Sequence, residues 1–189
     1  MAVQRPAESK ISRRSMLKRL GAASAVAWTA PVITSIKVPA FAQDYGGGEF
    51  DYGACGWRYK QVEHGGDPGF QSGPEPPGFA SGCAAFGSDD PHNCPLSHQT
   101  NWDVDTDMLL RRSVNVPVGT TNVEVGVAID NDFFAYWDGS QIGSGVHDGC
   151  AEPDSFVFGA PPDPGPHLLA VRGIDRGGES HLDVRLTIS

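Results

Sequence analysis

The fold class is decided by residues 108–143, which read MLLRRSVNVPVGTTNVEVGVAIDNDFFAYWDGSQIG. The middle of this stretch places apolar residues at every second position, at Val123, Val125, Val127 and Ile129. A period of two puts these side chains on one face of a β-strand. Residues 117–121 break the pattern before that strand, and Asp138-Gly139 is typical of a two-residue hairpin turn. The stretch therefore predicts three consecutive strands and a hairpin.

The segments that follow continue the alternation, over residues 155–159, 167–174 and 180–188. Residues 43–189 show no convincing helical periodicity, and short strands separated by turn signals are typical of an antiparallel sandwich. We therefore predict an all-β fold, an antiparallel β-sandwich. The predicted core includes Ile129, Phe134, Tyr136, Phe156, Phe158, Val171 and Leu186.

The part of the chain before residue 108 is rich in loops. Residues 43–54 are Gly-rich and acidic and predict a flexible lead-in, whereas residues 57–62 have the composition of a first strand. Residues 63–107 contain many Pro and Gly residues, and so long an irregular region is unusual in a compact domain. The sandwich domain is therefore expected at residues 55–189, with a long loop-rich N-terminal part.

The first 42 residues have the features of an export signal. Residues 12–18, SRRSMLK, resemble the twin-arginine motif, and the apolar run 20–36 leads to a small-residue cleavage site at Ala40-Phe41-Ala42. The alternative is a basic amphipathic surface helix. Gly and Pro interrupt the apolar run too often for a membrane span. We expect export by the twin-arginine route, to a secreted, periplasmic or cell-envelope location, with no membrane span in the mature chain.

Removal of this leader would leave a strongly acidic domain. Residues 43–189 carry seven of the 14 Lys and Arg residues and 22 of the 23 Asp and Glu residues, a formal charge of −15. Such a surface repels phosphate backbones, so nucleic acid is excluded as a partner. The same surface favours solubility and suits divalent cations.

All four cysteines follow the leader, and an even count in an exported domain suggests two disulfides. The cysteines allow three pairings. We favour Cys83 with Cys94, because this bond closes a short loop rich in Gly, Pro and Asp, which leaves Cys55 for Cys150. Their spacing does not match the gap of about two to four residues between the cysteines of structural zinc sites.

An acidic motif, Asp103-Val-Asp105-Thr-Asp107, suggests a cation site. In an extended chain, alternate residues point to one side, where three carboxylates offer the hard oxygen ligands that calcium prefers. The motif begins like an EF-hand loop, but Met108 stands where that loop needs Gly. The alternative is a solvated acidic loop. Calcium is thus a candidate cofactor.

Aromatic and polar residues near the predicted turns form the candidate ligand site. Phe70, Phe79, Trp102 and Trp137 offer flat rings that stack on the apolar faces of sugars. Asp130 and Asn131 follow the valine strand and offer hydrogen bonds to hydroxyl groups. The alternative for the aromatic residues is that they anchor the core or loops. The alternative for Asp130 and Asn131 is that their side chains cap a turn.

The order of several segments resembles the galactose-binding-like jelly roll. The segments are Gly56-Trp57-Arg58-Tyr59, Gly82-Cys83-Ala84-Ala85-Phe86-Gly87, Thr100-Asn101-Trp102 and then the strands of residues 108–143. The resemblance covers residues 55–189. It implies a non-catalytic module of the kind that accompanies secreted glycoside hydrolases, with a glycan or cell-surface polysaccharide as its partner.

No catalytic motif of the G-x-S-x-G or H-E-x-x-H type is present, and the six histidines lack short metal-binding spacing. We therefore predict an exported, non-enzymatic carbohydrate-binding module. One alternative is a structural or adhesive envelope protein that uses the sandwich to contact another protein. A second alternative is a small secreted hydrolase, which would need two facing carboxylates in a deep pocket.

Overall fold

The all-β prediction is confirmed by a computed structural model that describes residues 48–88, 97–149, 153, 154 and 156–189. All of these residues lie in one compact unit, Val38–Ser189. Ten strands and no helix are found among them, so this part of the chain offers no helical segment with the length and hydropathy to cross a membrane. The predicted leader and residues 43–47 of the lead-in lie outside the described residues.

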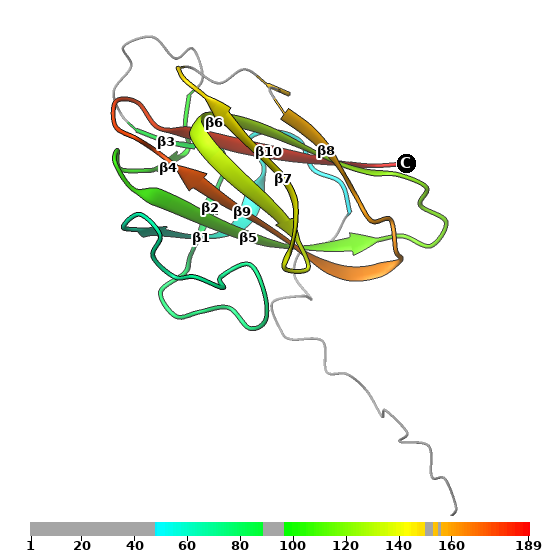
Figure 1. The fold of residues 1–189 in the computed structure, drawn as a ribbon. Coiled ribbons are helices and arrows are strands. Elements are labelled where there is room, and N and C mark those ends of the chain that lie inside the picture. The colour runs from blue at the N-terminus through cyan, green and yellow to red at the C-terminus, as the bar shows by residue number, and fades with distance from the viewer. Residues whose placement is uncertain (1–47, 89–96, 150–152, 155) are drawn as a thin grey trace, which may run out of the picture. The chain divides into compact units, whose positions relative to one another are not determined.

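The strands form two layers of a sandwich (Figure 1). The first layer, which we call the β5 sheet, is antiparallel throughout. Its strands, in spatial order, are β2 (Ala80–Cys83), β1 (Cys55–Val62), β5 (Asp107–Val116), β9 (Gly165–Ile174), the second half of β6 (Val123–Trp137) and β7 (Ser140–His147).

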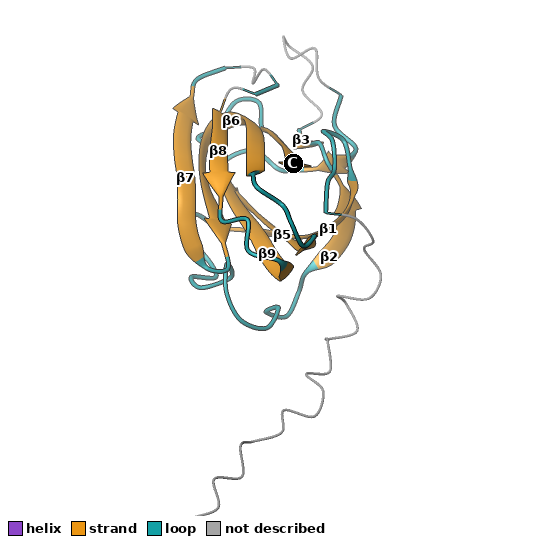
Figure 2. Cartoon of the chain, turned by 90° about the vertical axis from the view of Figure 1, so that its right-hand side faces the viewer, coloured by secondary structure: helices purple, strands orange, loops and turns teal. Residues whose placement is uncertain are grey.

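The second layer, the β10 sheet, faces the first across the core. Its strands, in spatial order, are β8 (Phe156–Ala160), the first half of β6, β10 (His181–Ile188), β3 (Phe86–Gly87) and β4 (Thr100–Asn101). Among the described strands only the short pair β3 and β4 is parallel. Figure 2 shows β7 and β8 at one side of the sandwich and β1 and β2 at the other.

Strand β6 belongs to both layers. Its residues 123–130 pair with β10, and residues 131–137 pair with β7. The odd-numbered residues of β6 face the core along both halves, and this set includes Ile129, Phe133 and Trp137. The period of two is therefore kept while the strand passes from one sheet to the other.

The predicted core is confirmed at Ile129, Val171 and Leu186, which are buried, and Phe156 and Phe158 pack against the same cluster. The prediction was wrong for Phe134 and Tyr136, which lie on the outer face of the β5 sheet and are half-buried. The physical reason is the alternation itself. Because Ile129 faces inward, the even-numbered residues that follow it in the strand face outward.

The loop that follows β1, residues 63–79, is held by a second, smaller apolar cluster. This cluster is formed by Phe70, Phe79, Leu109 and Ala170, with Val62 and Tyr136 packed against it. It lies on the outer face of the β5 sheet, because Leu109 alternates with the core residues Met108 and Leu110 of β5. The predicted loop-rich character of this region is confirmed.

The observed disulfide joins Cys55 to Cys83. These residues are direct partners across the antiparallel pair of β1 and β2. The predicted bonds from Cys83 to Cys94 and from Cys55 to Cys150 are therefore wrong, because strand pairing brings Cys55 and Cys83 together across 28 residues of sequence. Cys94 and Cys150 lie outside the described residues.

Candidate functional site

The outer face of the β5 sheet gathers side chains from three strands. Strand register places Leu109 of β5 beside Arg172 of β9, and Arg172 beside Phe134 of β6. In the next row of the same face, Arg111 lies beside Ala170, and Ala170 lies beside Tyr136. Segments far apart in the sequence therefore contribute to one continuous surface.

A cleft of about 410 Å³ opens between this surface and the loop of residues 65–71. Phe134, Tyr136, Arg172, Ile174 and Asp107 line it from the sheet, and Gly65, Pro68, Gly69, Phe70 and Gln71 line it from the loop. Pockets of this size with mostly apolar walls and a few polar groups are typical small-molecule sites. We treat this cleft as the candidate functional site.

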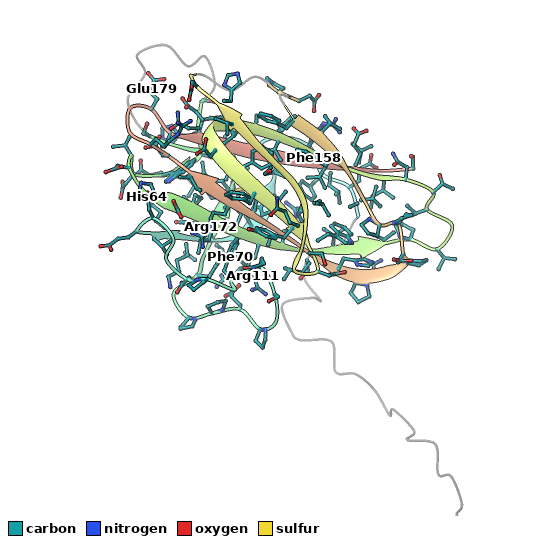
Figure 3. All side chains as sticks on the ribbon, viewed as in Figure 1. His64, Phe70, Arg111, Phe158, Arg172 and Glu179 are labelled. Carbon is teal, nitrogen blue, oxygen red and sulfur yellow. A yellow bond between two sulfur atoms is a disulfide. The ribbon has the colours of Figure 1, made fainter. Side chains whose placement is uncertain are left out.

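The aromatic part of the cleft is built in two levels. Phe70 is buried at the base and meets Tyr136 edge to face, with ring centroids 6.0 Å apart. The guanidinium carbon of Arg172 lies 5.3 Å from the centroid of the Phe70 ring, and Figure 3 shows these two side chains together. Phe134 and Tyr136 remain half-exposed above them, so flat apolar surface faces the cleft.

The polar wall of the cleft is a buried ion pair with hydrogen bonds to the loop. Asp107 is 1% exposed, and its Oδ2 accepts a bond of 2.5 Å from Nη1 of Arg172 and one of 3.0 Å from the Gly65 amide. Arg172 Nη2 donates to the Gly66 carbonyl at 2.6 Å. These contacts satisfy both charges and fix the start of the loop, so the wall is preorganised.

His64 continues this network toward solvent. Its Nδ1 lies 2.7 Å from Oδ1 of Asp107, and its Nε2 lies 3.2 Å from Oδ1 of Asp105. Hydrogen bonds to Asp107 first, and to Asp105 second, raise the pKa of His64 above its ordinary value. The protonated imidazole is therefore favoured beside the cleft.

The aromatic residues predicted to stack on a ligand lie in the interior instead. Trp102 is 0% exposed, and its Nε1 donates to Oγ1 of Thr106 at 3.1 Å. Trp137 is 3% exposed and stacks on His167, and Phe79 belongs to the small cluster under the loop. Rings with their faces covered by protein offer no stacking surface. Trp102, Trp137 and Phe79 therefore anchor the core and the loop, which is the alternative role considered for them.

Asp130 and Asn131 form part of a turn network at the end of the sandwich. Asn131 Nδ2 donates to Oδ1 of Asp130 at 2.5 Å, and Asn131 Oδ1 accepts from the Arg176 amide at 2.7 Å. Burial raises the pKa of Asp130 to about 6. The structure brings these two residues together with the turn that follows β9, and not with Phe79, Trp102 or Trp137. Their contacts are those of turn capping.

The three aspartates of the predicted cation site point to different partners. Asp103 Oδ1 accepts from Nδ2 of Asn101 at 2.8 Å, and Asp107 is committed to Arg172 and His64. Asp105 has a φ of +59°, a left-handed conformation that ends the extended alternation expected for the motif. The described residues contain no group of three His, Cys, Asp or Glu side chains able to hold a metal ion. Calcium binding stays a prediction.

Of the residues that line the cleft, sequence reasoning singled out only Phe70, as a stacking ring, and Asp107, as a cation ligand. Phe134 and Tyr136 were assigned to the core, and Arg172 was not among the candidate site residues. Phe134 and Tyr136 lie an odd number of residues after the inward-facing Ile129, and this spacing identifies them as outward-facing. The depth of the cleft depends on Phe70, which is brought over the sheet by a loop without periodicity.

No protein-family model matches the chain, and no curated protein matches it. Among solved structures, a PA14 sugar-binding domain from an RTX adhesin is similar with a TM-score of 0.33 and 17% identity, covering 49% of this chain and 50% of that one.

Two β-glucuronidases are also similar in fold. The enzyme of Faecalibacterium prausnitzii has a TM-score of 0.46 and 17% identity, covering 70% of this chain and 22% of that one. The enzyme of an uncultured Clostridium species has a TM-score of 0.47 and 15% identity, covering 75% of this chain and 28% of that one. The chain thus spans half or less of the length of each of these three solved structures.

Proposed function

We propose that this protein is an exported, non-catalytic carbohydrate-binding module and that it binds its glycan in the cleft on the β5 sheet. The observation that carries the proposal is the cleft of about 410 Å³ with the half-exposed rings of Phe134 and Tyr136 in its wall. The export part of the proposal rests on the twin-arginine-like sequence of residues 12–18.

The side chains of the cleft suit a sugar ring. The apolar C–H face of a sugar packs against flat aromatic side chains, while its hydroxyl groups need donors and acceptors at the edge. Phe134 and Tyr136 supply the rings, and Gln71 supplies an amide with both a donor and an acceptor. Because the Asp107–Arg172 pair fixes the opposite wall, little side-chain ordering is required when a ligand binds.

The chemistry of the cleft favours binding over hydrolysis. A glycosidase of the common type needs two carboxyl groups about 5–10 Å apart across the bond that is cleaved, and one of them must be protonated. Asp107 is the carboxylate in the cleft wall, and it is held by Arg172, His64 and the Gly65 amide. The described lining of the cleft thus holds one carboxylate, whereas this mechanism needs two.

The test is a Tyr136→Ala variant assayed on a glycan array and by titration with the best glycan found. We expect binding to weaken by about tenfold or more, because half of the aromatic platform is removed. The matched control is Val157→Ala, which removes an exposed apolar side chain from β8 and should leave binding unchanged. Absence of glycan binding by the folded domain, or equal loss in both variants, would contradict the proposal.

A further inference from the structure

The outer face of the β5 sheet continues past the cleft onto β7. Strand register places Ser144 of β7 beside Phe134, and Gln141 beside Tyr136. Because Phe134 and Tyr136 face outward, their direct partners on β7 lie on the same face of the sheet. The described lining of the cleft stops at β6. The cleft is therefore bordered by a strip of open surface on the neighbouring strand.

A β-bulge keeps both β7 side chains on this face. The register shifts between Ala135 and Tyr136 of β6, so β7 has one residue more than β6 in the stretch from Ser144 to Gln141. An extra residue reverses the alternation, and the odd-numbered Gln141 therefore shares a face with the even-numbered Ser144. Both side chains are exposed.

The covering loop decides the side on which the cleft is open. Over β1, Lys60 donates to Asp67 and, at 3.1 Å, to the Pro77 carbonyl, so the loop is bound to the sheet there. A β-carbon added at Gly139 would lie 2.9 Å from Cβ of Ser72, so the loop also meets the hairpin turn. Strand β7 is the last strand of the described β5 sheet, at one side of the sandwich (Figure 2). A ligand longer than the cleft therefore leaves it across the middle of β7.

The outer face of β7 carries the groups that a sugar residue needs. Ser144 offers a hydroxyl and Gln141 an amide, and neither side chain is hydrogen-bonded within the part of the chain that the structure describes. Val146, the partner of Asp132 on the same face, is 62% exposed and offers an apolar contact. Apolar surface with a few hydrogen-bonding groups beside it suits the C–H face and the hydroxyl groups of a sugar.

The core side of β7 holds this strip in place. Gly143 and Gly145 face inward, where an added β-carbon would lie 2.5 Å from the ring of Phe158 and 2.4 Å from the ring of Phe156, respectively. The two aromatic rings of β8 thus lie directly against the backbone of β7. A strand that is held in this way needs little ordering when a ligand binds.

The charge of this surface indicates the class of ligand. Strand β7, Ser140–His147, contains no Asp, Glu, Lys or Arg, and residues 43–189 around it have a formal charge of −15. An anionic chain would be repelled by the domain and would find no Lys or Arg on this strand. An uncharged chain meets no such repulsion.

We propose that the outer face of β7 is a second sugar subsite and that the protein recognises an uncharged chain of two or more sugar residues. One residue of the chain lies in the cleft on Phe134 and Tyr136. The next lies on β7 over Ser144 and Val146, with Gln141 beside it. Neighbouring strands are about 4.8 Å apart, which is close to the length of one sugar residue in a chain. This inference rests on the proposed glycan function and adds the length and charge of the ligand.

The first experiment measures affinity against chain length by NMR titration of the full chain. The probes are gluco-, galacto-, manno- and xylo-oligosaccharides, each from the single sugar to the hexasaccharide. In the series that binds, we expect the affinity to rise by about tenfold or more from the single sugar to the trisaccharide and then to level off. Equal affinity for the single sugar and the longer members would overturn the second subsite and leave the cleft as a glycan site. No binding of any member would overturn both.

Two variants locate the subsite, Ser144→Ala and Val146→Ala. Each should weaken binding of the trisaccharide by about fivefold and leave the affinity for the single sugar unchanged, because the single sugar occupies the cleft. The matched controls are Ser140→Ala, at the partner of the inward-facing Trp137, and Val157→Ala on β8. Neither control should change either affinity. Unchanged trisaccharide binding in both β7 variants, or an equal loss for the single sugar, would overturn the proposal.

The charge of the ligand is tested with the uronate trisaccharide that corresponds to the tightest-binding uncharged trisaccharide. We expect the anionic chain to bind about tenfold more weakly at low salt, because the acidic domain repels it. Equal or tighter binding of the anionic chain would overturn the assignment to uncharged chains.

Discussion

The outer faces of the two sheets are both covered by chain segments, but in different ways. On the β5 sheet, the loop of residues 63–79 is anchored through the ring of Phe70 and stands off the strands over Phe134 and Tyr136. On the β10 sheet, the Gly53 amide donates to both oxygens of Asp183, at 3.1 and 3.0 Å. This second segment pairs with the edge of β10 through Phe50 and Leu186, and its Tyr52 side chain reaches over β6.

Side-chain size explains the difference. A β-carbon added at Gly126 of β6 would lie 2.8 Å from the hydroxyl oxygen of Tyr52 and from Oδ1 of Asp154. The missing side chain lets Tyr52 and Asp154 hydrogen-bond to each other, at 2.9 Å, immediately above the strand. On the β5 sheet, the large outward side chains of Phe134 and Tyr136 hold the loop away, and a cleft remains. One strand, β6, thus presents a flat covered surface on its first half and one wall of the cleft on its second.

The largest effect is expected for Phe70→Ala, which removes the anchor of the loop on the β5 sheet. Phe70 is 1% exposed, and truncation of a buried Phe costs about 4 kcal/mol in the free energy of unfolding. Chemical denaturation checks the loss. Glycan binding should be lost as well, because Phe70 forms the base of the cleft. A stable variant with intact glycan binding would show that the loop is not held by this ring.

A smaller effect, and one that depends on pH, is expected for Asp183 under the cover of the β10 sheet. Burial raises the pKa of Asp183 from its ordinary value of 3.8 to about 6. Between about pH 4 and 6 the folded protein therefore keeps this proton bound, whereas the unfolded chain releases it. The protonated Asp183 side chain favours the folded state, and this stabilisation is lost as the pH rises through 6. At pH 8 the buried carboxylate is charged and costs roughly 2 kcal/mol.

The measurement is a comparison of Tm between wild type and Asp183→Asn from pH 4 to pH 8. The Asn side chain keeps an oxygen that accepts from the Gly53 amide, without the charge. We expect the variant to be the more stable protein at pH 8 and the two proteins to converge toward pH 4. Asp130 and His181 also have shifted pKa values, but both residues are present in both proteins. Their effects on the pH dependence of Tm therefore cancel in the comparison. A constant difference in Tm across the range would contradict this assignment.

The smallest effect is expected for Gly126→Ala on β6. The new methyl group meets Tyr52, Asp154 and Arg185 at less than 3.0 Å. These are the outer parts of flexible side chains, so we expect a cost of only about 1 kcal/mol. Hydrogen exchange should show faster exchange of the Gly53 amide, and glycan binding on the β5 sheet should be unchanged. A change in glycan affinity would mean that the two faces of the sandwich are coupled.

Much of the fold could be predicted from local pattern. The alternation from Val123 to Ile129 identified a strand with one inward face, and the turn at Asp138-Gly139 was expected before β7. The errors have specific causes. Phe134 and Tyr136 were assigned to the core because aromatic residues suit it, although their position relative to Ile129 places them outside. Trp102 was expected near a ligand because it lies near a predicted turn, but its burial depends on strands distant in the sequence.

The sequence by itself determined the all-β class, the inward face of residues 123–129, and the strong negative charge of residues 43–189. These properties follow from composition and from a period of two, which are local. Only the tertiary structure decided that Cys55 pairs with Cys83, that Arg172 lies against Asp107, and that Arg111 is buried beneath the loop. Each of these contacts depends on the register between strands that are far apart in the chain, and local alternation does not specify that register.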